Sequence, residues 1–396
     1  MNASCARARP VKVLLIQKMA GIAGSENYFL NLLPRMVTSG IEAHFLCVQK
    51  PGDSAMNLVF ARTLEEAGVK VHLIDSAASL SFRLIRAIHR LIRTEHYDIV
   101  QTNLIHADVW GAIIKRFLMP DMVLVSVKHG YSESYQARHG LDPAHVGLDR
   151  FSLLTRWAGR KADRIVTISQ GLRQLLTGAG LADAAKCRVI PYGFSFDDAV
   201  SSFPAHAVRF GEPQLLIVGR LVEVKQHRLV LDILPELVRR FPRLKLVIVG
   251  AGPLEGDLKA LAEARGIADS VEWQGFRKNV HDYFRASDVL VLPSAAEGFG
   301  LVILEAWHNK IPVLAFDVPA PNEIICDGET GVLVPPFDTA ALLDRLSSLL
   351  SDPATARAMG ERGQAAYRDR YTLDVMHEST LALYREVLEE RRRTPA

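Results

Sequence analysis

The sequence predicts an α/β protein with two domains, each a doubly wound parallel sheet covered by helices. Short apolar runs alternate with helical patterns along almost the whole chain, and such alternation implies parallel strands joined by crossover helices. The 396 residues are enough for about two domains. The alternation stops at 196–212, a segment rich in Ser, Ala, Asp and Pro that we interpret as a linker. We therefore expect domains at 1–195 and 213–372, followed by a C-terminal helix within 373–396.

The strands of the first domain are predicted from apolar runs of strand length. They lie at 11–16, 41–48, 69–74, 97–102, 122–128, 163–168 and 187–190. Helical periodicity falls between them, most clearly at 26–39 and 82–93. The second domain repeats the alternation without repeating the sequence, with strands predicted near 214–219, 244–249, 270–274, 288–292, 312–316 and 331–335. A last helix is predicted at 374–391.

Composition and charge exclude several classes of protein. The net charge of +3 is too small to indicate a nucleic-acid-binding protein. The four cysteines lie far apart without a metal-binding spacing, so we expect reduced thiols of a cytoplasmic protein. No apolar run reaches the roughly 18 residues of a membrane span. The run 11–16 is shorter than a signal-peptide core and is better interpreted as a first strand.

The clearest candidate site is the stretch 293–306, which follows the predicted strand 288–292 and consists of a loop and the start of a helix predicted at 301–308. Gly298 and Gly300 allow a tight loop directly before the helix. Free backbone N–H groups and the positive end of the helix dipole make such a junction an anion site. Glu297 in the loop and Glu305 in the helix bracket it, about 12 Å apart if the segment between them is helical. Because carboxylates do not bind phosphate, we expect hydroxyl groups as their partners; two solvated glutamates are the structural alternative.

Two cations follow the first predicted strand of the second domain. Arg220 and Lys225 are expected near Gly300, because the carboxyl ends of parallel strands share one edge of a sheet. Arginine grips phosphate bidentately and lysine acts as a point charge. The chain has no P-loop, no HExxH and no D-x-D pair. These cations and the helix start can stabilise phosphate charge, so we expect no metal requirement and no cofactor.

A glycine-bearing turn at 250–256 resembles a dinucleotide fingerprint, but the pattern is incomplete. The third glycine of the fingerprint would fall at Glu255, and Pro253 stiffens the turn. An NAD-dependent oxidoreductase is an alternative that rests on this turn alone.

His129 follows the predicted strand 122–128. Ligands of doubly wound sheets gather at the carboxyl ends of strands, so a histidine there can hydrogen-bond a substrate. A single histidine in a loop is more often structural, and the residues alone leave both interpretations open.

Four arginines form a stripe on the predicted helix 82–93, within about 80° of one another around its axis. They are Arg83, Arg86, Arg90 and Arg93. Such a stripe can lie on anionic lipid or receive an acidic acceptor. The solvated outer face of a sheet-covering helix is the more common explanation.

Taken together, these motifs resemble the GT4 family of retaining glycosyltransferases, whose fold is GT-B. The resemblance rests on Gly219-Arg220-Leu221 with Lys225, and on Ser294-x-x-Glu297-Gly298-Phe299-Gly300-Leu301-x-x-Leu304-Glu305-Ala306 with its E-x7-E spacing. Further matches are Val189-Ile190-Pro191-x-Gly193, Asp327-Gly328-Glu329-Thr330-Gly331 and the Gly24-Ser25-Glu26 loop. The similarity covers about 11 to 385.

The resemblance implies two Rossmann-like domains facing a central cleft, with a nucleotide-sugar donor on the C-terminal domain and the acceptor mostly on the N-terminal one. The final helix would cross back to the N-terminal domain. The implied catalytic residues are His129, Glu297, Arg220 and Lys225. The implied donor-binding residues are Gly24, Gly219, Arg220, Lys225, Phe276, Arg277, Glu297, Gly298, Phe299, Gly300, Leu301, Val302 and Glu305, of which Phe276 and Arg277 would lie near the nucleobase and Glu305 near the ribose. The acceptor could be lipid-linked, a saccharide or a small molecule. The arginine stripe favours a peripheral contact with an anionic membrane on its cytoplasmic face.

The chain departs from the family pattern at several positions. Ala23-Gly24 stands where a glycine pair is usual, Tyr192 where asparagine is usual, and Pro319-Ala320 where a second glycine pair is usual. Lys310 replaces a glycine, and the neighbouring Asn309 is expected to supply the helix-ending conformation. These changes affect the sugar and acceptor surfaces, so donor identity does not carry over. A catalytically silent, sugar-nucleotide-binding relative is a further alternative.

Overall fold

The computed structural model describes residues 9–19, 24–52, 54–130, 150–196, 208–277 and 280–393. The chain divides into two compact units. Unit 1 is Met1–Phe194 with Leu373–Ala396, and unit 2 is Ser195–Thr372. Of the linker expected at 196–212, residues 197–207 lie outside the described part of the chain.

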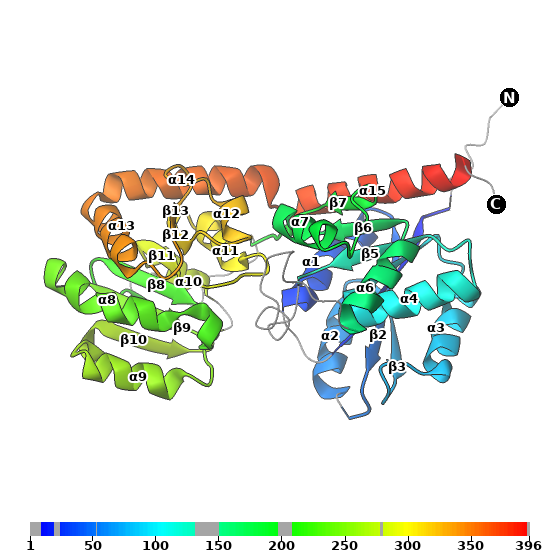
Figure 1. Ribbon diagram of the computed structural model, residues 1–396, viewed down its shortest axis with the longest axis horizontal. Helices are drawn as coiled ribbons and strands as arrows, with labels where there is room; N and C mark the ends of the chain where they lie inside the picture. The colour runs from blue at the N-terminus through cyan, green and yellow to red at the C-terminus, as the bar shows by residue number, and fades with distance from the viewer. Residues whose placement is uncertain are drawn as a thin grey trace. The chain divides into compact units, whose positions relative to one another are not determined.

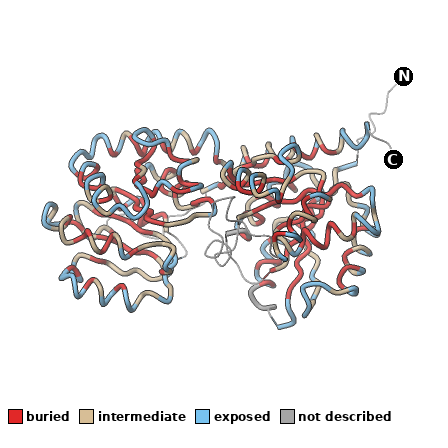
Figure 2. Tube along the Cα trace, in the orientation of Figure 1, coloured by how far each residue is buried: buried red, intermediate tan, exposed pale blue. Residues whose placement is uncertain are grey.

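Unit 1 is built on a parallel sheet of seven strands in the order β3-β2-β1-β4-β5-β6-β7 (Figure 1). The strands are β1 (Lys12–Lys18), β2 (Glu42–Gln49), β3 (Lys70–Asp75), β4 (Ile99–Asn103), β5 (Leu124–Lys128), β6 (Arg164–Thr167) and β7 (Cys187–Val189). Figure 2 shows the central strands buried along their length. Burial on both faces explains why these strands are continuous apolar runs instead of alternating patterns.

Seven helices of unit 1 are described. They are α1 (Gly24–Thr38), α2 (Ser54–Glu66), α3 (Phe82–Glu95), α4 (Leu104–Phe117), α6 (Arg150–Lys161), α7 (Gln170–Gly178) and α15 (Leu373–Arg393). Helices α3 and α4 pack on one face of the sheet around the fully buried Trp110. The last helix, α15, packs against α1 although the whole of unit 2 separates them in sequence.

Helix α3 illustrates how local sequence sets an element. The Ser81 side chain accepts a hydrogen bond from the backbone N–H of Leu84, which caps the helix N-terminus. Apolar side chains recur with helical spacing and are buried on one face; they are Leu84, Ile85, Ile88 and Ile92. His96 ends the helix in the left-handed conformation, with φ of 54°. The four arginines of the predicted stripe are all exposed.

Unit 2 contains a parallel sheet of six strands in the order β10-β9-β8-β11-β12-β13. The strands are β8 (Gln214–Val218), β9 (Lys245–Val249), β10 (Val271–Gly275), β11 (Val289–Leu292), β12 (Val313–Phe316) and β13 (Val332–Val334). The helices are α8 (His227–Arg240), α9 (Glu255–Ala264), α10 (His281–Arg285), α11 (Leu301–His308), α12 (Pro321–Ile324), α13 (Thr339–Ser351) and α14 (Pro353–Arg370), with short 3-10 turns η3 (Glu223–Lys225) and η4 (Ala268–Ser270). Helices α8, α9 and α13 share one apolar core with the sheet.

Each sheet reverses its winding direction at one point. In unit 1 the reversal lies between β1 and β4, and in unit 2 it lies between β8 and β11. Ligands of doubly wound sheets bind beyond the carboxyl ends of the strands at such a switch point. The loops that follow β8 and β11 carry Lys225 and Glu297, so the topology brings the two sequence motifs to one place.

The predicted strands agree with the described ones to within two residues at each end, and α11 has the predicted bounds. One local expectation is wrong. Asn309 has φ of −88°, whereas Lys310 itself adopts the left-handed conformation with φ of 60°. The reason lies in the contact with α14, because the Gly360 backbone passes directly over the Lys310 carbonyl and fixes the turn there.

Candidate functional site

Two loops of unit 2 meet at the switch point of its sheet. We call them the Lys225 turn (219–225), which follows β8, and the Glu297 loop (293–300), which follows β11. The backbone N–H of Ala295 donates to the carbonyl of Val224 at 2.8 Å, which ties the loops together. The Lys225 Nζ donates to the Glu297 Oε1 at 2.6 Å. The Lys225 side chain is 20% exposed and the Glu297 side chain 9%, so this ion pair is only partly shielded from solvent.

The Glu297 loop ends at the N-terminus of α11. Gly300 occupies the N-cap position with φ of 84°, a conformation that glycine adopts without strain. Within the described ranges, no side chain caps this terminus. Gly300 and Phe299 are buried, while Gly298 is exposed and Leu301 and Val302 are half-buried. The first backbone N–H groups of α11 are therefore available to an anion without competition from a described capping side chain.

Glu305 lies on the second turn of α11 and is half-buried. Desolvation raises the pKa of its carboxyl to about 7. Within the described part of the chain its carboxylate has no hydrogen bond or ion pair. A buried carboxylate without a partner is costly unless a ligand supplies hydrogen-bond donors. Arg220, the other predicted cation, is exposed at the end of β8.

Two glycines of the turn 250–256, Gly250 and Gly252, serve packing within unit 2. A Cβ atom at Gly250 would lie 1.8 Å from the carbonyl oxygen of Gly219, and one at Gly252 would lie 2.4 Å from that of Leu221. The Leu221 N–H also donates to the Ala251 carbonyl at 3.0 Å. The turn therefore supports the backbone on either side of Arg220, which explains these two glycines without a dinucleotide.

Phe276 and Arg277 follow β10, the edge strand of the sheet. Phe276 is 77% exposed, and Arg277 is also exposed. Among the described residues, neither side chain makes a hydrogen bond or ion pair to the Lys225 turn. A ring this exposed is available to a ligand.

In unit 1, His129 lies at the carboxyl end of β5 and both of its ring nitrogens have protein partners. Its Nε2 lies 3.0 Å from Asn103 Oδ1, and its Nδ1 lies 2.6 Å from the Tyr192 hydroxyl. The Asn103 amide group donates to the Ile16 carbonyl, so its Oδ1 is the acceptor that faces the histidine. His129 Nε2 must then carry the proton, and Tyr192 donates to Nδ1. Burial lowers the pKa of His129 to about 3, so the ring is neutral.

A second layer of hydrogen bonds supports Asn103. Gln101 Nε2 donates to Asn103 Oδ1 at 3.3 Å, and the Tyr384 hydroxyl donates to Gln101 Oε1 at 2.7 Å. Tyr384 lies on α15, so the C-terminal helix reaches His129 through two side chains. We call this chain of contacts the His129 network; its members are Asn103, Gln101, Tyr192 and Tyr384 with His129.

A cavity of about 290 Å³ opens beside His129 at the carboxyl ends of β4 and β5. Its lining is mainly apolar and includes Leu104, Ile105 and Leu172. Leu104 has φ of 66°, which is rare for a bulky residue and places it at the first position of α4. Lys128, which also lines the cavity, pairs with the buried Asp108, and Asp108 also accepts hydrogen bonds from Thr102 and Ser126.

Gly24 is the first residue of α1, and the preceding loop 20–23 lies outside the described residues. The neighbouring Glu26 is buried and accepts a hydrogen bond from Gln17 Nε2 at 2.6 Å.

In the described ranges, no group of three or more His, Cys, Asp or Glu side chains is arranged to hold a metal ion. Over the same ranges, no helix has the length and apolar character that crossing a bilayer requires.

Two doubly wound parallel sheets, with a cation–carboxylate pair and a helix start at the switch point of the second, are the features expected of a GT-B glycosyltransferase. The family profile described as "Glycosyltransferase Family 4" matches residues 22–198, and the one described as "Glycosyl transferases group 1" matches 201–366. Together they account for most of the chain, which belongs to this glycosyltransferase family.

Individual proteins agree with this assignment. The chain is 32% identical over 241 residues to an alpha-D-kanosaminyltransferase of Streptomyces kanamyceticus, an alignment that spans 59% of this chain and 62% of that protein. It is 33% identical over 223 residues to a glycogen synthase of Mycobacterium tuberculosis, spanning 55% of this chain and 52% of that one. The chain thus matches little more than half the length of these relatives. The crystal structure of Anabaena Alr3699/HepE in complex with UDP has the same fold, with a TM-score of 0.78 at 20% identity over 95% of this chain and all of that one.

Sequence reasoning missed the partners of His129. Tyr192 was noted only as a departure from the family pattern, and Gln101 and Asn103 were not singled out. A signal was present, because both are polar residues at the end of a buried apolar strand, the feature that drew attention to His129. No sequence signal connects Tyr384 to this site, since 283 positions separate it from Gln101.

Proposed function

We propose that the protein is a retaining, metal-independent glycosyltransferase that moves a sugar from a nucleotide-diphosphate sugar to an acceptor hydroxyl. One observation carries this proposal: the Lys225–Glu297 pair, the uncapped start of α11 and the unpartnered Glu305 carboxylate belong to one edge of the unit 2 sheet. These groups provide a cation and N–H donors for a diphosphate and carboxylates for hydroxyl groups. A nucleotide sugar carries both kinds of group.

In this proposal the donor binds to unit 2. Arg220, Lys225 and the backbone N–H groups near Gly300 hold the diphosphate, and Glu305 accepts hydrogen bonds from the ribose hydroxyls. Glu297 contacts the hydroxyls of the transferred sugar. The 2.6 Å contact with Glu297 holds Lys225 in place before the donor arrives, so less side-chain entropy is lost on binding.

The proposed reaction forms a bond between the acceptor oxygen and the anomeric carbon on the face from which the nucleotide leaves. The bond between the anomeric carbon and the β-phosphate oxygen breaks, and that oxygen takes the proton of the acceptor hydroxyl. Positive charge around the diphosphate stabilises the leaving group as its charge develops. His129 is neutral and lies in the acceptor-binding unit, where the His129 network fixes its orientation.

We infer that the acceptor uses the cavity of about 290 Å³ beside His129. Its apolar lining favours an acceptor with an apolar portion, such as a lipid-linked intermediate or a small molecule with an aliphatic or aromatic group. A long, uniformly polar saccharide fits such a lining less well, because polar groups lose hydration there without gaining partners.

A thermal-shift screen of UDP-, GDP- and ADP-sugars, with and without EDTA, tests the donor proposal. UDP-sugars are tested first, because the Anabaena HepE structures are complexes with UDP or UDP-glucose. A ligand at 100 times its Kd should add about 2.7 kcal/mol to the free energy of unfolding. We expect a shift with one nucleotide class that EDTA leaves unchanged and that Glu305→Ala abolishes.

A shift that requires a divalent metal would contradict metal independence. No shift with any nucleotide sugar would favour the silent relative or a donor site completed only by acceptor. The anomeric configuration of the transferred sugar, compared by NMR with that of the donor, decides whether the transfer is retaining.

We also propose that helix α3 lies against the anionic, cytoplasmic surface of a membrane. Leu80 and Phe82 beside its start are 54% and 78% exposed, so apolar side chains accompany the four exposed arginines. Basic and apolar side chains together bind a charged bilayer surface more strongly than either kind alone. The three described cysteines are free thiols, which fits a reducing compartment.

Co-sedimentation with vesicles tests the membrane proposal. We expect binding to vesicles containing phosphatidylserine at low salt, and loss of binding when Arg83, Arg86, Arg90 and Arg93 become glutamine. In the matched control, glutamine replaces Arg391, Arg392 and Arg393 of α15, which removes exposed cations from another helix. Equal binding by both variants would refute a specific role for α3.

A further inference from the structure

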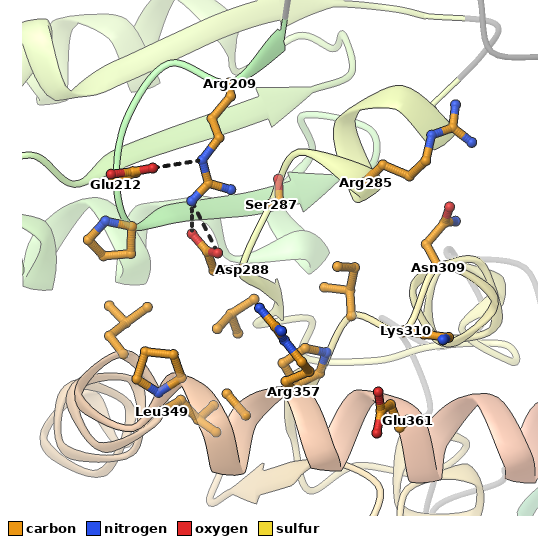
Figure 3. Close-up of a pocket in the computed structure, with 17 residues that line it drawn as sticks. Arg209, Glu212, Arg285, Ser287, Asp288, Asn309, Lys310, Leu349, Arg357 and Glu361 are labelled. Carbon is orange, nitrogen blue, oxygen red and sulfur yellow. Dashed lines mark hydrogen bonds and ion pairs between the residues drawn. The ribbon is translucent and has the colours of Figure 1, made fainter. Parts of the chain in front are cut away.

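A second cavity, of about 660 Å³, lies in unit 2 away from the proposed donor site (Figure 3). Its lining includes Pro213, Val289 and Pro312, which stand at the amino ends of β8, β11 and β12. The Lys225 turn and the Glu297 loop follow the carboxyl ends of the same sheet. In a parallel sheet the amino ends and the carboxyl ends of the strands lie on opposite sides of the domain. A ligand in this cavity would therefore bind in addition to the donor. The volume is typical of a pocket for a small organic ligand.

The floor of the cavity is apolar. Leu349 and Leu350 at the end of α13 and Ala356 on α14 are 6%, 8% and 6% exposed, and Ile311 is 8% exposed. An apolar group placed on this floor would remove further apolar surface from water.

Four cations and three carboxylates line the cavity, and some of them neutralise one another. Arg209 donates to both oxygens of Asp288 at 3.2 and 2.9 Å and lies 3.8 Å from Glu212. Figure 3 shows this group on one side of the hollow. Arg285 pairs with the buried Asp282 and points away from the cavity centre in Figure 3. Arg209, Asp288 and Arg285 are therefore already satisfied by the protein.

The side chains of Lys310 and Arg357 make no hydrogen bond or ion pair among the described residues. Both side chains are exposed, Lys310 on the turn after α11 and Arg357 on α14; in Figure 3, Arg357 extends from α14 toward the middle of the hollow and Lys310 lies to its right. Glu361, one turn after Arg357 on α14, is the third charged side chain that has no described partner. Two available cations over an apolar floor favour an anion, and one available carboxylate opposes it.

The backbone at Lys310 supports a role for its side chain. Lys310 has φ of 60°, a conformation that costs energy for a residue with a Cβ and that glycine adopts freely. A Cβ atom at Gly360 would lie 2.0 Å from the Lys310 carbonyl oxygen, so α14 packs tightly against this turn. Packing against α14 therefore fixes Lys310 at the rim of the cavity, in a conformation that a residue with a Cβ seldom adopts.

We propose that this cavity binds a small organic anion with an apolar body, of the class of aryl or alkyl phosphates and carboxylates. Its anionic group is held by Lys310 and Arg357, and its apolar body lies on Ile311 and Leu349. The site does not depend on the proposed glycosyl transfer.

Isothermal titration calorimetry of the full chain at low salt tests this site with phenyl phosphate, inorganic phosphate and benzyl alcohol. Phenyl phosphate should bind more tightly than inorganic phosphate or benzyl alcohol, because it alone carries both the anionic and the apolar group. Lys310→Gly should weaken the binding of phenyl phosphate about tenfold, as the loss of one charge-assisted contact predicts. Glu361→Gln should strengthen the binding of phenyl phosphate, because it removes a negative charge. Lys310→Gly is expected to fold, because glycine suits the positive φ.

Two controls separate this site from others. His96→Gly relieves a similar left-handed residue, with φ of 54°, in unit 1 and should leave the affinity unchanged. Lys225→Ala removes the cation of the donor site and should also leave it unchanged. The proposal is overturned if phenyl phosphate does not bind, if Lys310→Gly binds it as wild type does, or if Lys225→Ala alone abolishes binding.

Discussion

The switch point of unit 2 and the His129 region of unit 1 occupy the carboxyl edges of two sheets with the same winding, yet their polar groups are satisfied differently. In unit 1, both ring nitrogens of His129 have protein partners, and a second layer of side chains supports them. In unit 2, Glu305 has no described partner, and the Lys225–Glu297 pair remains partly open to solvent.

The difference indicates a division of tasks. Groups that a protein leaves unsatisfied can gain hydrogen bonds from a ligand, so their removal reduces binding. Groups that are already satisfied gain little from a ligand but hold a side chain in one orientation and tautomer, so their removal reduces the rate. We expect substitutions in unit 2 to change donor affinity, and substitutions in the His129 network to change kcat.

Gly250→Ala should have the largest effect. The new Cβ would lie 1.8 Å from the Gly219 carbonyl oxygen, at a position where φ is 153°. We expect destabilisation of about 3 kcal/mol or more and loss of nucleotide-sugar binding, because the turn supports the backbone beside Arg220. Urea unfolding and thermal shift measure both. Gly256→Ala, in a helix with open space around it, is the control and should be neutral or slightly stabilising. Equal behaviour of the two variants would show that the turn does not support the site.

Lys225→Ala should weaken donor binding about 100-fold, because it removes a phosphate contact and leaves Glu297 without its partner. Titration with the nucleotide sugar measures the change. The control is Lys259→Ala, which breaks an exposed ion pair of similar length, 2.7 Å, with Glu255. It should change neither the free energy of donor binding nor that of unfolding by more than about 1 kcal/mol. A Lys225→Ala variant with wild-type affinity would place the diphosphate elsewhere.

Tyr192→Phe should lower kcat about tenfold and leave the donor Kd unchanged, since it removes the hydroxyl that orients His129. Tyr283→Phe removes a comparable hydrogen bond in unit 2, at 3.0 Å to Gln274, and should not affect kcat. If Tyr192→Phe changes the donor Kd instead, the division between the two units is wrong.

The pH dependence of stability should show the smallest effect, about 1 kcal/mol, because Glu305 is only half-buried. Its pKa is about 7 in the folded protein and 4.5 ordinarily, so folding favours the neutral form. The stabilisation is complete below pH of about 4.5 and is lost as the pH rises through about 7. Glu305→Gln stays neutral, so its stability relative to wild type should rise between these pH values. A difference that does not change with pH would mean that the carboxylate is solvated in the free protein.

Much of the architecture follows from the sequence because its signals are local. A continuous apolar run predicts a buried parallel strand, and Gly298 and Gly300 before a helical pattern predict the start of α11. The winding rule for parallel sheets then places Lys225 and Glu297 at one edge. The same local reasoning was wrong at Lys310, where a contact with Gly360, 50 positions on, decides the backbone conformation.

The sequence by itself determined the two α/β units, the order of their elements and the residues at the strand ends. Only the tertiary structure decided which side chains meet: Lys225 with Glu297, Tyr192 with His129, and Tyr384 with Gln101. It also decided which groups remain available, because Glu305 at the donor edge and Lys310 at the opposite cavity depend on what surrounds them in space. The physical reason is that secondary structure follows from periodicity within a few turns, whereas burial and hydrogen-bond partners depend on residues far apart in the chain.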